Sequence, residues 1–151
     1  MLFLFTNKFI IKSNIIINAE KMFYLKSEEI IYTVGKTLIN VNDQYYIDGY
    51  DLTFLKNKMI LFSNKKTTIT DINSNVYKLE QFQYLINEEV LKGEKIFYRR
   101  NEIENKEDEY YFETGFFNLK NNKFLGKNTN MTFHKTLFFN EENDPRVNAA
   151  I

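Results

Sequence analysis

Four related stretches decide the fold: MFYLKSEEII (residues 22–31), LTFLKNKMIL (52–61), FQYLINEEVL (82–91) and FFNLKNNKFL (116–125). Each begins with apolar or aromatic residues at alternate positions, continues through turn-forming or charged residues, and ends in two apolar residues. Alternation with a period of two is typical of a half-buried β-strand, and the polar centre is typical of a tight turn. Each stretch is therefore predicted to form a strand, a turn and a second strand.

The four stretches are spaced by 30, 30 and 34 residues, which indicates a repeat. Weaker alternating segments lie upstream and downstream of each stretch, so a repeat supplies two strands or more. A unit of this size cannot bury its apolar face alone, and neighbouring units must share one elongated core. The sequence predicts an all-β, elongated stack of short antiparallel strands. The alternative is an ordinary meander or sandwich with evenly spaced hairpins.

Composition agrees with an all-β domain and excludes several classes of protein. The 151 residues include 15 Phe and 10 Tyr, which suit a pleated, half-buried surface. The net charge is zero and Cys is absent. Neutral charge argues against a nucleic-acid partner, and the lack of Cys excludes disulfides and thiolate metal sites.

Catalytic and metal-binding patterns are not found in the sequence. His134 is the single histidine, and the acidic pairs 28–29, 88–89 and 141–142 are adjacent residues, which point to opposite faces of a strand or lie in turns. The polar run 99–109 is predicted to be a solvated loop, because it lacks the ligand spacing of a calcium loop. We expect no catalytic residue, no metal, no cofactor and no enzymatic activity.

The chain divides into three segments. Residues 1–14 are predicted to be an N-terminal extension or an incomplete first repeat, residues 15–139 the repeats, and residues 140–151 an exit segment towards a further C-terminal region. The apolar run at 1–5 is too short for a membrane-spanning helix, and the basic residues follow it rather than precede it, unlike a secretory signal.

The repeated apolar positions are the candidate site. Stacking of the repeats would align them on one face, either as an ordinary core or as an apolar groove between two sheets held apart by large aromatic residues. The candidate groove residues are Met22, Tyr24, Ile30, Leu52, Phe54, Ile60, Phe82, Tyr84, Val90, Phe116 and Phe124.

Two segments carry a resemblance to a known family. The run YIDGYDLTF (46–54) resembles the repeat of the OstA-like β-jellyroll proteins of lipopolysaccharide (LPS) transport, represented by LptA, LptC and LptD. The segment from Tyr110 to Lys127, followed by NDPRV (143–147), is most similar to the end of the periplasmic domain of the LPS-assembly proteins of the LptD type. The resemblance covers roughly residues 15–147 and implies an elongated antiparallel β-jellyroll.

The resemblance also implies a function. An OstA-like module is non-catalytic, lies on the periplasmic side of the outer membrane, holds the acyl chains of LPS in its groove and passes LPS to the outer membrane. Its implied partners are LPS, an LptA-like β-jellyroll protein that pairs with the strand edge near residues 9–17, and an LptE-like lipoprotein if a barrel follows. The alternatives are a structural or adhesin-like scaffold with a closed core, and a polysaccharide-active β-helix enzyme, which would need clustered acids.

Overall fold

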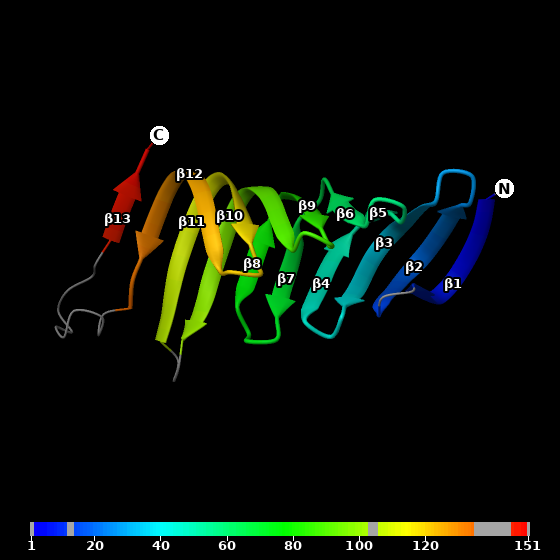
Figure 1. Cartoon of the computed structure of the whole chain (residues 1–151), viewed down its shortest axis with the longest axis horizontal. Coiled ribbons are helices and arrows are strands. Elements are labelled where there is room, and N and C mark those ends of the chain that lie inside the picture. Colours follow the sequence, from blue (N-terminus) through cyan, green and yellow to red (C-terminus); the bar gives the residue numbers. More distant parts are fainter. Residues whose placement is uncertain (1, 12–13, 103–105, 135–145, 151) are drawn as a thin grey trace.

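The computed structural model describes residues 2–11, 14–102, 106–134 and 146–150, and these contain β-strands and turns but no helix. The strands are β1 (Leu2–Ile11), β2 (Ile15–Leu25), β3 (Ile30–Val41), β4 (Tyr45–Tyr50), β5 (Thr53–Leu55), β6 (Ile60–Ser63), β7 (Thr67–Asp71), β8 (Val76–Leu79), β9 (Gln81–Leu85), β10 (Val90–Glu102), β11 (Lys106–Asn118), β12 (Lys123–Thr132) and β13 (Arg146–Ala149). All pairings are antiparallel, and β1 and β13 lie at opposite ends of an elongated molecule (Figure 1). The all-β prediction is confirmed.

Two long strands, β3 and β10, are shared by two sheets. One half of β3 pairs with β5 and the other half with β4, while β10 pairs first with β9 and then with β8. Between them β5, β6 and β9 form one sheet and β4, β7 and β8 form the other. We call these the repeat sheet and the opposite sheet. The strand order closes on itself through β3 and β10, so the two sheets enclose a common interior.

Further long strands extend both sheets towards the ends of the molecule. β2 pairs along the full length of β3, and β1 pairs with β2. At the other end β11 and β12 continue from β10, and β13 adds a short strand to β12. The arrangement confirms an elongated stack in which each repeat contributes strands to both sheets.

The period of the sequence is visible as a row of four-residue turns on the repeat sheet. The turns span 26–29, 56–59, 86–89 and 119–122, and the last residue of each has a positive φ of 53–55°. Successive turns are linked by backbone hydrogen bonds of 2.8–3.0 Å, donated by Lys56, Ile86 and Leu119 to the carbonyls of Glu29, Met59 and Glu89. Each new turn therefore satisfies the orphan carbonyl of the previous one, which fixes the stacking of the repeats.

The fourth hairpin differs from the prediction by one residue. Its left-handed turn residue is Asn122, which follows Glu89 by 33 residues rather than 34. A slip of one residue exchanges the two faces of a strand. Phe117, which exposes 4% of its surface, therefore occupies the core position, and Phe116, at 42%, lies on the outer face.

The polar run 99–109 is also different from the prediction. Instead of a loop, β10 and β11 continue as a hairpin with residues paired from Arg99–Glu109 to Glu102–Lys106. Arg100 and Glu109 are exposed, and an exposed strand face tolerates charge as readily as a loop does, whereas Asp108 is buried and accepts a hydrogen bond from the backbone N–H of His134.

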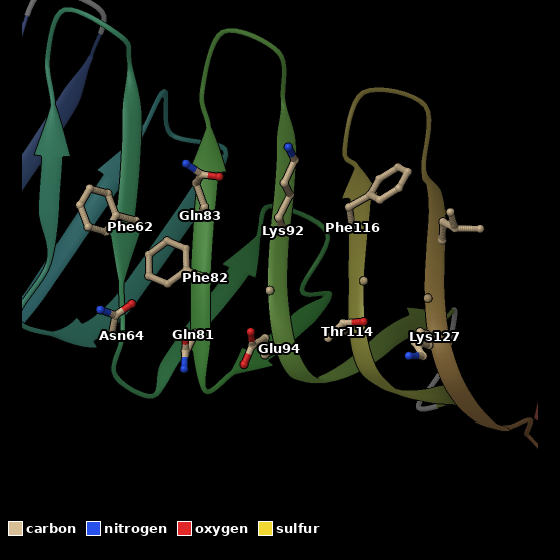
Figure 2. A pocket seen from close by; sticks show the side chains of 14 residues that line it. Phe62, Asn64, Gln81, Phe82, Gln83, Lys92, Glu94, Thr114, Phe116 and Lys127 are labelled. Atoms are coloured by element: carbon tan, nitrogen blue, oxygen red, sulfur yellow. The ribbon is translucent and has the colours of Figure 1, made fainter. Parts of the chain in front are cut away.

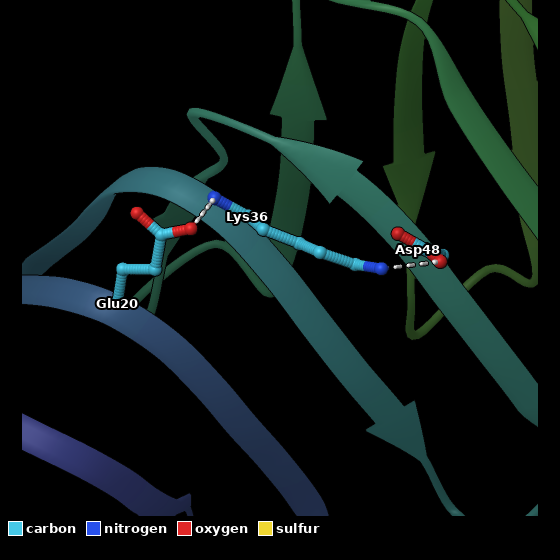
Figure 3. A network of polar contacts seen from close by, with 3 residues as sticks. All are labelled: Glu20, Lys36 and Asp48. Atoms are coloured by element: carbon cyan, nitrogen blue, oxygen red, sulfur yellow. Dashed lines mark hydrogen bonds and ion pairs between the residues drawn. The ribbon is translucent and has the colours of Figure 1, made fainter.

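A polar cluster fixes the bend of β3 where it passes from one sheet to the other. β3 carries a bulge at Gly35 and Lys36, which lie opposite the single residue Glu20 of β2, and Gly35 adopts a φ of 84°. A side chain at Gly35 would overlap the carboxylate of Glu20. The backbone N–H of Lys36 donates to Glu20 Oε1 at 3.3 Å, and Lys36 Nζ lies 3.6 Å from Asp48 Oδ2 (Figure 3). Glycine is the residue that such a bulge favours, because it adopts a positive φ without a steric cost.

Candidate functional site

The interior of the repeat sheet is a cross-strand ladder of apolar side chains. Directly opposite residues of an antiparallel pair share a face. In register across β2, β3, β5, β6, β9, β10, β11 and β12 this ladder contains Tyr24, Ile31, Phe54, Leu61, Tyr84, Leu91, Phe117 and Phe124. Tyr24, Phe54 and Tyr84 lie on one face, as predicted. Ile31 lies between Tyr24 and Phe54 in the ladder, and Leu61 lies between Phe54 and Tyr84.

A second ladder crosses the opposite sheet and faces the first. Its members are Ile17, Ile39, Ile47, Ile69, Tyr77, Tyr98, Tyr110 and Met131. All of them belong to the core or pack against it. The sequence contains this ladder as the weaker alternating segments, but their short length concealed that they form a continuous apolar surface.

The predicted groove residues divide into three groups. Met22, Leu52, Phe54, Phe82 and Tyr84 are inside and expose at most 4% of their surface. Tyr24 and Phe124 are half-buried and pack against this core.

The third group lies on the outer face. Ile30, Ile60 and Val90 are half-buried there, next to Ile31, Leu61 and Leu91, which are the buried members of each pair. Phe116 is likewise on the outer face. The reason is the turn: a four-residue turn pairs Leu85 with Val90, so the inward Tyr84 is opposite Leu91. The residues that face the interior are therefore Ile31, Leu61, Leu91 and Phe117, each of which directly follows one of the four outer-face residues.

Aromatic rings fill the interior near its C-terminal end. Tyr77 and Tyr98 stack with centroids 4.7 Å apart, and Phe117 packs edge-on against both at 5.2 Å. Phe124 contacts Phe112 at 5.3 Å. Such edge-to-face and offset pairs add to the stabilisation from burial alone.

Burial changes the acidity of the phenols in this interior. Desolvation raises the pKa of Tyr77, Tyr84 and Tyr98 above the ordinary value. Burial, together with the nearby carboxylates of Glu89 and Asp71, raises the pKa of Tyr45 to about 12. The phenols are neutral at physiological pH, so the interior carries no charge from them.

Two rows of turns border the interior on the side away from the bends. One row consists of the four turns of the repeat sheet, and the other contains the turns after β3 and β7. Within the described residues, backbone hydrogen bonds run along each row and none joins the two rows. Side chains close this side, including Tyr45, which packs edge-on against Tyr84 at 5.7 Å. We call it the mouth of the interior.

The described residues offer little for catalysis or metal binding. No group of three or more His, Asp or Glu side chains lies close enough among them to hold a metal ion. His134 follows the end of β12, and its backbone N–H donates to Asp108 Oδ1 at 2.9 Å. Glu28–Glu29 and Glu88–Glu89 lie in turns of the repeat sheet, whereas Glu141–Glu142 and residues 143–145 lie outside the described residues. No helix in the described part is long and apolar enough to cross a membrane.

Two sheets that share long bent strands around an apolar interior define an antiparallel β-jellyroll. The fold is similar to the crystal structure of LptH, the LptA-homologous periplasmic component of the lipopolysaccharide transport device of Pseudomonas aeruginosa. The TM-score is 0.62 at 10% sequence identity, over 91% of this chain and 94% of LptH. The predicted OstA/LptA-like β-jellyroll fold is confirmed, and the closer likeness to LptD stays a prediction. No protein-family model and no curated protein matches the sequence.

Proposed function

We propose that this chain is a non-catalytic module of lipopolysaccharide transport that holds acyl chains between its two sheets. The observation that carries the proposal is the pair of apolar ladders, which face each other across eight strands each. The likeness to LptH over nearly the whole of both chains supports it. Periplasmic location and delivery of LPS to the outer membrane belong to the same proposal.

An apolar interior solves the physical problem of lipid transfer. Each methylene group exposed to water costs about 0.8 kcal/mol, so an acyl chain leaving a bilayer needs a continuous apolar path. The ladders provide such a path along the long axis, and neutral tyrosines keep it free of charge. Transfer then requires no chemical step.

The acyl chains enter through the mouth. The core is closed in this conformation, with Met22 and Leu91 exposing 0% of their surface. On the side of the bends β3 and β10 connect the sheets covalently, whereas side-chain packing alone holds the mouth in the described structure. Separating the sheets at the mouth breaks none of the described backbone hydrogen bonds between turns, because these run along each row and not across the mouth. The acyl chains then contact the core side chains that contacted each other before.

The end strands suit the partners of a transport bridge. β1 pairs with β2 on one side, and within the described residues its other edge has no strand beside it. An open edge is a template for β-augmentation, and an LptA-like β-jellyroll protein is the proposed partner. An LptE-like lipoprotein is a partner only if a barrel follows the chain.

Locking the mouth tests the proposal. The chain has no Cys, so Tyr45→Cys with Glu89→Cys introduces two unique thiols on opposite sides of the mouth. Joining them with a reducible bismaleimide is expected to abolish uptake of LPS from micelles, and reduction is expected to restore it. The matched control, Lys36→Cys with Asp48→Cys, joins β3 to β4 on one sheet and leaves uptake unchanged. Equal uptake by the locked and unlocked protein would refute entry at the mouth.

The second candidate is a scaffold with a permanently closed core. The nearly complete burial of the interior favours it. Under this alternative, neither the locked nor the unlocked protein takes up LPS.

A further inference from the structure

A trough of about 960 Å³ crosses the outer face of the repeat sheet, on the opposite side from the ladders. It runs over β6, β9, β10, β11 and β12 between two rows of outward side chains (Figure 2). Four strand spacings make it about 19 Å long. A volume of this size is within the range of small-molecule sites.

Three aligned glycines create the trough. Gly93 is paired with Gly115, and Gly115 with Gly126. A Cβ atom at Gly93 would overlap Leu79, and one at Gly126 would overlap the ring of Phe112. The backbone at these glycines therefore lies directly against core side chains. Any larger residue at the three positions would prevent this close approach. Because the backbone approaches the core at this point, the outer face of the sheet is concave there.

The walls of the trough expose apolar surface without a partner in the chain. Phe116 exposes 42% and Leu125 exposes 60% of their surface, and they are directly opposite each other on β11 and β12. Phe62 extends the apolar lining towards β6. Contiguous exposed apolar surface in a concave site indicates a binding function.

The occupant is a hydrocarbon chain rather than a peptide. The trough lies on the face of a sheet, where the N–H and C=O groups of β9, β10 and β11 are already used between strands. A peptide laid there would leave its own amides without partners, which is costly. An aliphatic chain has no such groups and matches a long, narrow, apolar site.

The charges at the rim favour an anionic head group. Lys92 and Lys127 line the trough, and neither forms an ion pair with a described residue. The lining also contains one carboxylate, Glu94. Two lysines against one glutamate leave the lining with a net positive charge.

We propose that this trough binds a single-chain anionic amphiphile, a long-chain fatty acid, across the outer face of the repeat sheet. The site is distinct from the interior proposed for LPS, because its lining side chains other than Phe82 and the glycines point away from the core. A fatty acid bound here does not require the sheets to separate.

Binding of cis-parinaric acid, a fluorescent long-chain fatty acid, below its micellar concentration tests the site. The whole protein is expected to bind it saturably. Leu125→Glu places a charge in the trough and Thr114→Trp fills it, and each is expected to raise the dissociation constant at least about tenfold. Lys92→Gln is expected to raise it about two- to fivefold, and for the fatty acid only, not for the corresponding alcohol.

The matched control is Leu38→Glu, an equivalent change at a residue that is 46% exposed on the outer face of the opposite sheet. It should leave the dissociation constant unchanged within twofold. Because both leucines are exposed, both variants should retain the unfolding temperature of the wild type. Absence of saturable binding by the wild type, or equal binding by the Leu125→Glu and Leu38→Glu variants, would overturn the proposal. Mouth-locked protein should still bind the fatty acid, which separates this proposal from that for LPS.

Discussion

The two halves of the interior are built from different side chains. On the opposite sheet the N-terminal half is aliphatic, with Ile17, Ile39, Ile47 and Ile69 in register, and Phe54 is a buried ring of the repeat sheet there. The C-terminal half contains a contiguous set of stacked and edge-on rings: Tyr77, Tyr98, Tyr110, Phe112, Phe117 and Phe124. β-branched residues pack on a pleated surface with little dependence on orientation, whereas rings interlock in specific geometries. We therefore expect the aromatic half to be the more rigid end of the interior, and the sheets to separate at lower cost in the other half.

The largest expected effect is in the aromatic half. Phe112 exposes 1% of its surface, contacts Phe117 and Phe124, and lies beneath Gly126. Phe112→Ala should reduce the free energy of unfolding by about 3–5 kcal/mol, measured by urea denaturation. Phe116→Ala, four residues along the same strand but on the outer face, should cost less than about 1 kcal/mol. Similar losses for the two variants would contradict the corrected register.

The next effect tests the contact between the glycine row and the rings. Gly126→Ala should cost about 1–3 kcal/mol because the new methyl group overlaps Phe112. In the background of Phe112→Leu, which has no ring, the same substitution should cost clearly less. A double-mutant cycle measures this coupling, and additive effects would mean that the backbone does not rest on the ring.

Alkaline pH should destabilise the fold through its buried tyrosines, among which are Tyr77 and Tyr98 of the aromatic half. The pKa values of Tyr77 and Tyr98 in the folded state are above the ordinary value of 10.0. Above that pH the unfolded chain releases phenolic protons that the folded chain retains, so stability falls as pH rises. Each such tyrosine contributes a slope of up to about 1.4 kcal/mol per pH unit. Tyr77→Phe should make the loss of stability between pH 10 and pH 12 shallower, and an unchanged slope would contradict the assignment.

The smallest effect belongs to the aliphatic half. Ile47 exposes 1% of its surface, and Ile47→Val should cost only about 0.5–1.5 kcal/mol, because a small loss of volume is absorbed by neighbouring aliphatic chains. Hydrogen exchange should show faster opening of β4 and β7 than of β10 and β11. Slower exchange in β4 and β7 would reverse the comparison of the two halves.

The repeat and its strand–turn–strand form could be predicted because each hairpin is local. The alternation in 82–91 and the turn at 86–89 are sufficient to place Tyr84 inside. The fourth repeat could not be placed to the residue, since FF at 116–117 fits either face and only the turn at 119–122 decides between them. The same ambiguity put Ile30, rather than Ile31, in the predicted groove.

Features that depend on strand pairing between repeats could not be predicted from the sequence. The trough exists because Gly93, Gly115 and Gly126 are opposite one another, although they are far apart in the chain. The alignment of the three glycines across three strands follows from the register of the strands alone. The pairing of residues 99–102 with residues 106–109 is hidden in the same way, because charged residues are typical of loops and of exposed strands.

Photo-crosslinking tests the central proposal, that acyl chains lie between the sheets, most directly. Tyr84, inside the repeat sheet, and Tyr46, 48% exposed on the outer face of the opposite sheet, are replaced in turn by benzoylphenylalanine. After incubation with labelled LPS and irradiation, the variant at position 84 should crosslink to LPS and the variant at position 46 should not, with both retaining a β-sheet circular dichroism spectrum. Crosslinking at position 46 but not at 84, or at neither, would contradict an LPS-conducting interior.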